Sequence, residues 1–204
     1  MFQVHADAGT VSELIALGRF AAERGWVPAT SGNFSRRLDA RHIAVTRSGR
    51  DKGALTEADF AVVALDEPLP PGVSAETPLH VARYRRDQAI GAVVHVHSLA
   101  ATVASRADEA KGAVVLEGFE MHKALDGFTT HESTLRIPIF PNAQDTVELA
   151  RRIESSLGDA PVPGYLLAGH GIYAWGATVA DARRHVEAFD YLLRCSLEER
   201  RMKQ

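Results

Sequence analysis

Two histidines separated by a single residue stand at the end of an apolar run, at His95 and His97. Side chains at positions i and i+2 of a strand project from the same face, so these imidazoles are expected a few ångströms apart. Such a pair can chelate one metal ion. Two histidines hydrogen-bonded at a strand end would give the same pattern, so a third ligand is needed to choose between the two interpretations.

The third candidate is His170, which lies between Gly169 and Gly171 after another apolar run. Glycines on both sides permit a close backbone approach or unusual dihedral angles that a surface histidine does not require. Three imidazoles leave an open position on zinc, as catalytic zinc sites do. Nitrogen ligands favour zinc over magnesium or calcium, although manganese, iron or cobalt could substitute. These residues therefore indicate a catalytic metal site.

Helical and extended patterns alternate along the chain that must position these histidines. Helices are expected at 10–25, 77–86, 98–105, 120–125, 145–157 and 178–202. Strands are expected at 42–46, 61–65, 90–96, 113–116, 135–140, 165–168 and 172–175. The turn at 48–49 suggests that the strands around it pair antiparallel, and 29–33 is expected to be a loop. The alternation predicts an α/β sandwich around a mixed sheet, with residues 1–204 as a single domain.

Composition narrows the class of protein. The chain has 204 residues, 46% of them hydrophobic, which is enough to bury a core without disulfide or metal staples. Its net charge of -3 gives no electrostatic reason to expect nucleic acid or an anionic membrane as a partner. Cys195 is the single cysteine and cannot form an internal disulfide. Since the N-terminus also lacks a basic segment followed by an apolar run, a reducing cytoplasmic location is expected.

Five short segments, in this order and at comparable spacing, resemble the class II aldolase family of sugar-phosphate aldolases, epimerases and dehydratases: 30–33, 46–49, 76–80, 95–98 and 169–171. The resemblance implies an α/β/α sandwich with a largely antiparallel sheet. It also implies one zinc ion per subunit on His95, His97 and His170, a small phosphorylated ketose as substrate, and a homotetramer with sites near subunit interfaces.

The same resemblance implies a phosphate-binding role for one loop and one turn. Their backbone N–H groups and hydroxyls would hold the anion without a strongly basic pocket. The residues concerned are Thr30, Ser31, Gly32, Asn33, Ser48 and Gly49. The alternative is that these are ordinary turns rich in glycine, serine and asparagine.

One branch of the family, the methylthioribulose-1-phosphate dehydratases of methionine salvage, is most similar in segments 25–33, 48–53, 117–125 and 171–176. In that branch the glutamate matching Glu120 is the acid/base, whereas the aldolases rely on a glutamate in the segment matching Glu76. This chain has both. Glu76 could be a helix-start carboxylate, a spectator near zinc or a fourth metal ligand.

The two chemistries differ in which bond breaks. Dehydration of 5-methylthioribulose 1-phosphate removes the C3 proton and the C4 hydroxyl and yields 5-methylthio-2,3-dioxopentyl phosphate. An aldolase reaches a similar enediolate by breaking the C3–C4 bond, so a metal site alone does not separate the two. A base at C3 selects elimination, and Glu120 is the candidate. The alternatives are a class II sugar-phosphate aldolase or pentulose-phosphate 4-epimerase, and a non-catalytic module like the adducin relatives.

Overall fold

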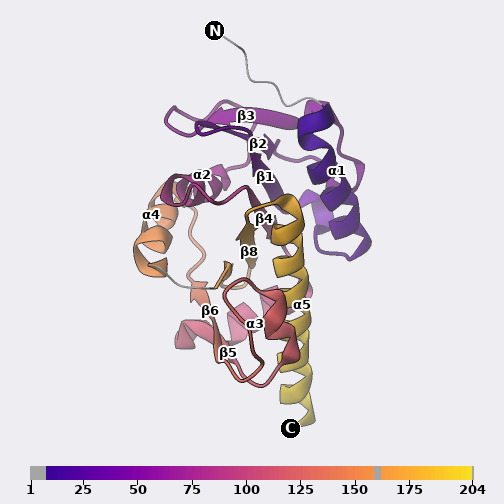
Figure 1. Ribbon diagram of the computed structural model, residues 1–204, viewed down its shortest axis with the longest axis vertical. Helices are drawn as coiled ribbons and strands as arrows, with labels where there is room; N and C mark the ends of the chain where they lie inside the picture. The colour runs from indigo at the N-terminus through magenta and orange to yellow at the C-terminus, as the bar shows by residue number, and fades with distance from the viewer. Residues whose placement is uncertain (1–7, 159–161, 204) are drawn as a thin grey trace.

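The computed structural model describes residues 8–158 and 162–203 (Figure 1). The α-helices in this part of the chain are α1 (Ala8–Glu23), α2 (Thr77–Arg86), α3 (Leu99–Ala107), α4 (Thr146–Leu157) and α5 (Val179–Met202). The strands are β1 (Asn33–Arg37), β2 (His42–Thr46), β3 (Phe60–Ala64), β4 (Ala92–Val96), β5 (Ala113–Leu116), β6 (Leu135–Phe140), β7 (Gly164–Leu167) and β8 (Gly171–Gly176). Short 3-10 helices include η1 (Pro28–Thr30), η2 (Lys52–Ala54) and η5 (Glu120–Ala124).

The strands form one sheet in the order β3-β2-β1-β4-β8-β7-β6-β5. Neighbouring strands pair antiparallel except β6 and β7, which are parallel. The expected α/β fold with a mixed, largely antiparallel sheet is therefore confirmed, as is the antiparallel pairing of β2 with β3. None of the described helices is both long and apolar enough to span a membrane.

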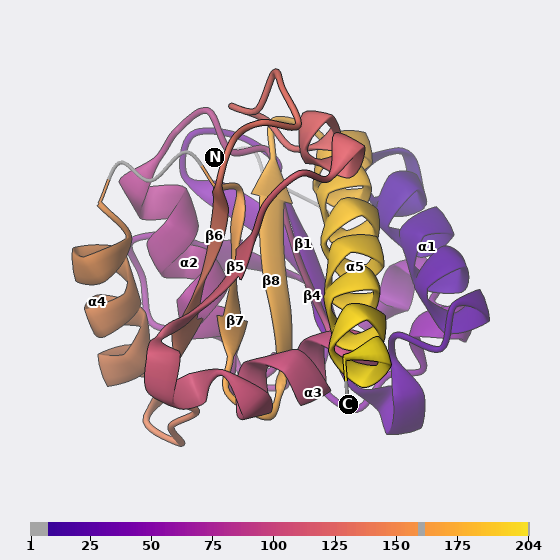
Figure 2. The same ribbon diagram turned by 90° about the horizontal axis from the view of Figure 1, so that it is seen from below.

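Helices cover both faces of the sheet, with α2 and α4 on one face and α1, α3 and α5 on the other (Figure 2). The alternation of side chains along each strand divides the core between these faces. In β4, Val94 and Val96 pack with the α1, α3 and α5 side, whereas Val93 packs with α2 and α4. His95 shares the parity of Val93, so its side chain faces α2. The i, i+2 spacing thus directs both histidines toward one helix.

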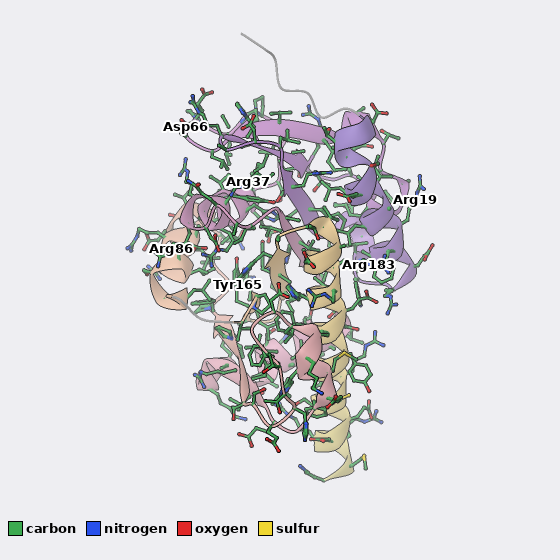
Figure 3. All side chains as sticks on the ribbon, in the orientation of Figure 1. Arg19, Arg37, Asp66, Arg86, Tyr165 and Arg183 are labelled. Atoms are coloured by element: carbon green, nitrogen blue, oxygen red, sulfur yellow. The ribbon has the colours of Figure 1, made fainter. Side chains whose placement is uncertain are left out.

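The strand register places three site side chains in one row. Asn33 of β1 lies opposite His95 of β4, which in turn lies opposite Tyr173 of β8. The His95 and Tyr173 rings stack at 4.1 Å between centroids, and Tyr165 continues the stack at 4.9 Å. Figure 3 shows Tyr165 inside the molecule, with Arg19 and Asp66 at its periphery. The ring of the metal-binding candidate His95 is therefore packed against a stack of two tyrosine rings.

Candidate metal centre

Four side chains converge beyond the end of β4. Glu76, His95, His97 and His170 each offer one ligand atom, and these atoms all lie within 4.8 Å of one another. The Nε2 atom of His97 is 2.9 Å from Nε2 of His95 and 2.9 Å from Nε2 of His170. The structure thus brings together the three histidines that the sequence singled out, and adds Glu76 to them.

The outer ring nitrogens show which atoms carry the lone pairs. His95 Nδ1 lies 3.0 Å from the carbonyl oxygen of Ile172, and His170 Nδ1 lies 3.3 Å from Oδ1 of Asn142. An oxygen acceptor requires a proton on Nδ1, so the Nε2 lone pairs of both rings point into the cluster. Converging lone pairs repel each other unless a cation lies between them. The donor set therefore fits a metal ion.

The protonation states fit the same conclusion. Burial holds the pKa of His95 well below its ordinary value, although Glu76 opposes this shift. Burial also lowers the pKa of His97 to about 4; the neighbouring His170 and Lys52 add to the shift, while Glu76 opposes it. Neutral imidazoles are the form that binds metals.

Glu76 is the residue before α2 and faces the histidines through both carboxylate oxygens, at 3.0 Å from His170 Nε2 and 3.4 Å from His95 Nε2. Asn33 Nδ2 donates to its Oε2 at 2.7 Å. Burial raises the pKa of this carboxyl, but His95, His170 and Asn33 together hold it below its usual value. Glu76 is therefore an ionised member of the cluster and starts a helix as well.

The loop and turn expected to bind phosphate lie beside this cluster, but their residues are not equivalent. Asn33 is buried and its side chain is engaged by Glu76 and Ser74. The backbone N–H of Ser48 donates to the Gly72 carbonyl, which leaves its exposed hydroxyl for a ligand. The Oγ of Ser31 is buried and lacks a hydrogen-bond partner. Whether these groups hold a phosphate stays a prediction.

Gly32 lies closer to the backbone of the metal cluster than a residue with a side chain could. Its φ is +75°, and a Cβ added there would lie 2.7 Å from the carbonyl oxygen of His95. Gly25 has a similar φ of +68° but open space around it. Gly32→Ala should therefore lower the free energy of unfolding by about 1 kcal/mol more than Gly25→Ala. Denaturant titration of both variants checks this, and equal losses would show that the contact with His95 is not tight.

Glu120 does not join the cluster within one chain. It is the first residue of η5, which is held near the start of α5: the Asp126 N–H donates to His185 Nε2, and His185 Nδ1 donates to the Trp175 carbonyl. Trp175 lies near the C-terminal end of β8, whereas His170 immediately precedes its N-terminal residue. The length of β8 separates these ends by roughly 17 Å. In Figure 2 the segment around residue 120 lies at the end of the sheet opposite α3.

The surroundings of Glu120 suit a group that acts outside its own chain. Its side chain is 70% exposed, and Lys123 Nζ donates to Oε1 at 2.5 Å. This lysine holds the pKa of the Glu120 carboxyl below its usual value. The carboxylate is thus ionised, accessible and held in one place. Its role as the acid/base stays a prediction.

Sequence comparison gives the family. The chain matches the Class II Aldolase and Adducin N-terminal domain family over residues 12–197. The chain belongs to the class II aldolase family. The class II aldolase relatives include methylthioribulose-1-phosphate dehydratase from Xanthomonas euvesicatoria, 51% identical over 190 residues that cover 91% of this chain and 87% of the relative. The enzyme of the same name from Parvibaculum lavamentivorans is 51% identical over 187 residues, covering 91% and 92%.

Among solved class II aldolase structures, L-fuculose-1-phosphate aldolase from Thermus thermophilus superposes with a TM-score of 0.78 at 25% identity. It covers 96% of this chain and 97% of the other. These findings confirm the family, which was expected from the five motifs. They also confirm its dehydratase branch, which was expected from the segments 25–33, 48–53, 117–125 and 171–176.

Proposed function

We propose that this class II aldolase relative catalyses the zinc-dependent dehydration of 5-methylthioribulose 1-phosphate to 5-methylthio-2,3-dioxopentyl phosphate in methionine salvage. The observation that carries the proposal is the convergence of one nitrogen from each of three imidazoles with one carboxylate oxygen. The dehydratases that are 51% identical to it support the choice of reaction. An enzyme fits this arrangement better than a non-catalytic module, which has no need of a buried ligand set.

Zinc is the proposed ion, because a site with three imidazoles favours it over harder cations. His95, His97 and His170 would hold it, with Glu76 facing the same point. When bound, zinc supplies Lewis-acid polarisation of the substrate oxygens next to C3. Asn33 fixes the Glu76 carboxylate by donating to its Oε2 at 2.7 Å.

The elimination itself requires a proton carrier. In the proposed reaction Glu120 accepts the C3 proton, and the same carboxyl then gives a proton to the C4 hydroxyl as the C4–O bond breaks and water leaves. The resulting enol at C3 becomes a ketone by protonation at C4. Glu120 can carry out both proton transfers because C3, which loses the proton, and C4, whose hydroxyl receives it, are adjacent.

Glu120 would reach the cluster from a neighbouring subunit of a homotetramer. The separation of Glu120 from His170 within one chain supports this arrangement. So does the surface next to the cluster: α3 exposes 78% of Leu99 and 44% of Val103. Leu99 also lines an open depression of about 450 Å³ with His97 and His170. Apolar side chains at the mouth of a site fit a surface that another subunit covers.

A chemical trap separates the candidate reactions. Dehydration produces adjacent ketones at C2 and C3, which condense with o-phenylenediamine to a quinoxaline. Aldol cleavage and 4-epimerisation produce no adjacent ketones. We expect the purified protein with 5-methylthioribulose 1-phosphate to give the quinoxaline, and the chelated protein to give none. Consumption of substrate without any quinoxaline would favour the aldolase or epimerase alternative.

Ser48→Ala tests the phosphate assignment. The hydroxyl of Ser48 would contact a group that is distant from C3 and unchanged in the reaction, so its loss weakens ground state and transition state equally. We expect KM to rise by roughly 10-fold, with kcat within about twofold of wild type. Steady-state kinetics measure both. An unchanged KM with a collapsed kcat would show that Ser48 acts at the reacting carbons instead.

A further inference from the structure

Lys52 is a lysine in the interior of the protein. Only 2% of its surface is exposed, although it belongs to a short 3-10 helix between polar segments. The backbone of η2 lies against α1, where a Cβ on Gly18 would come within 2.2 Å of the Lys52 carbonyl oxygen. This contact holds the backbone of η2 against α1. The lysine charge is close enough to the metal cluster to help lower the pKa of His97.

The ammonium group joins the two segments assigned to phosphate. Lys52 Nζ donates to the carbonyl oxygen of Thr30 at 2.5 Å and to that of Arg50 at 2.8 Å. Thr30 has a φ of +62° and Ala29 a φ of +51°, both in the left-handed region that disfavours residues with a side chain. The lysine therefore holds a strained loop against the turn that follows Ser48.

Among the residues that the structure describes, no carboxylate serves as a counter-ion for this buried positive charge. Within residues 8–158 and 162–203 no carboxylate forms an ion pair with Lys52 at 4.0 Å or less. Asp51 and Glu76 attract it from farther away, but the Asp51 carboxylate caps η2 through Gly53, and Glu76 faces the histidines. Buried charges in proteins are normally paired, because desolvation is costly. An anion that binds beside this ammonium would supply the missing charge.

We infer that Lys52 is the electrostatic anchor for the phosphate group of the substrate, holding the loop of Thr30 and the turn of Ser48 around an anion. The inference rests on the proposed function, since it names the group that recognises that substrate. Lys52 acts as a positioning residue: it shapes the loops and places a fixed charge behind them. The buried Ser31 Oγ, which lacks a partner, offers a further hydrogen bond to the same anion.

Lys52→Met removes the charge and keeps the length of the side chain. We expect it to weaken binding of inorganic phosphate by roughly 10-fold to 100-fold, the loss of one charge-assisted interaction. Calorimetry with inorganic phosphate measures this without turnover. Lys52→Arg, which retains the charge, should recover most of the affinity. Lys111→Met is the matched control, because that lysine is exposed and pairs with Asp108.

A purely structural role predicts a different pattern in kinetics. If Lys52 contributed only to the stability of the fold, Lys52→Met would lower kcat/KM equally for 5-methylthioribulose with and without its phosphate. If it anchors the phosphate, the preference of the enzyme for the phosphorylated substrate falls by the same 10-fold to 100-fold. Wild-type phosphate affinity in a folded Lys52→Met protein would overturn the inference, whatever the reaction proves to be.

The wild-type protein provides an answer even when Lys52→Met does not fold. The other lysines are Lys111, Lys123 and Lys203. With ¹³C-labelled lysine, inorganic phosphate should shift the Cε resonance of Lys52 and leave that of Lys111 in place. Saturating phosphate that leaves the Lys52 signal unchanged would overturn the inference. Phosphate binding by a protein that fails to dehydrate the substrate would instead preserve the anchor and reject the proposed function.

Discussion

Glu120→Gln is expected to lower kcat by roughly 10²-fold to 10⁴-fold, while metal content and substrate affinity stay near wild type. The amide keeps the shape of the side chain but cannot accept the C3 proton. Glu76→Gln should lower kcat less, because Glu76 faces the histidines and is held by Asn33, whereas Glu120 carries the C3 proton in the proposed reaction. Turnover and bound metal are measured on the same samples. Near wild-type turnover by Glu120→Gln, with an inactive but metal-loaded Glu76→Gln, would reverse the roles and favour an aldolase.

Mixing two inactive variants tests whether the site is shared between subunits. Glu120→Gln retains its histidines, and His97→Ala retains its Glu120. If each site takes these groups from different chains, subunits mixed during refolding regain activity at about a quarter of the sites, because each half is drawn at random from two kinds of subunit. No recovery in mixed oligomers would mean that Glu120 does not act across an interface.

His97→Ala is expected to lose metal and activity together, with activity falling to background. Its Nε2 lies between those of His95 and His170, so its removal opens the centre of the ligand set. The fold should persist, because a core of this size does not depend on the ion. Elemental analysis and kinetics on one preparation provide the measurement. His42→Ala is the control, because His42 lies on β2, away from the cluster, and pairs with Asp39. Full zinc occupancy in His97→Ala would contradict the assignment.

Much of the fold follows from local sequence patterns. The strands at 42–46, 113–116 and 135–140 and the helix at 77–86 have the predicted bounds. β1 was not predicted, because Asn33, Ser35 and Arg37 give it a polar pattern unlike a buried strand. Ser35 and Asn33 are buried because their side chains form hydrogen bonds with residues outside the strand: Ser35 with His80, and Asn33 with Glu76. Such partners come from distant segments, so local patterning misses them.

The candidate site likewise contains some residues that the sequence predicted and others that only the tertiary structure reveals. The spacing of His95 and His97 and the glycines around His170 were sufficient to predict their convergence. The sequence left three roles open for Glu76, and only the tertiary structure brings it to the histidines. Lys52 was missed altogether, because lysine is normally solvated and its burial depends on the contact of η2 with α1. Its position in the segment that resembles the dehydratases, 48–53, was the available signal.

The mass of the product tests the central claim most directly. Purified, zinc-loaded protein is incubated with 5-methylthioribulose 1-phosphate, and the products are measured by mass spectrometry. The proposed dehydration predicts a single phosphorylated product lighter than the substrate by one water. Two fragments from cleavage between C3 and C4, or an isomer of unchanged mass, would contradict it and identify an aldolase or an epimerase.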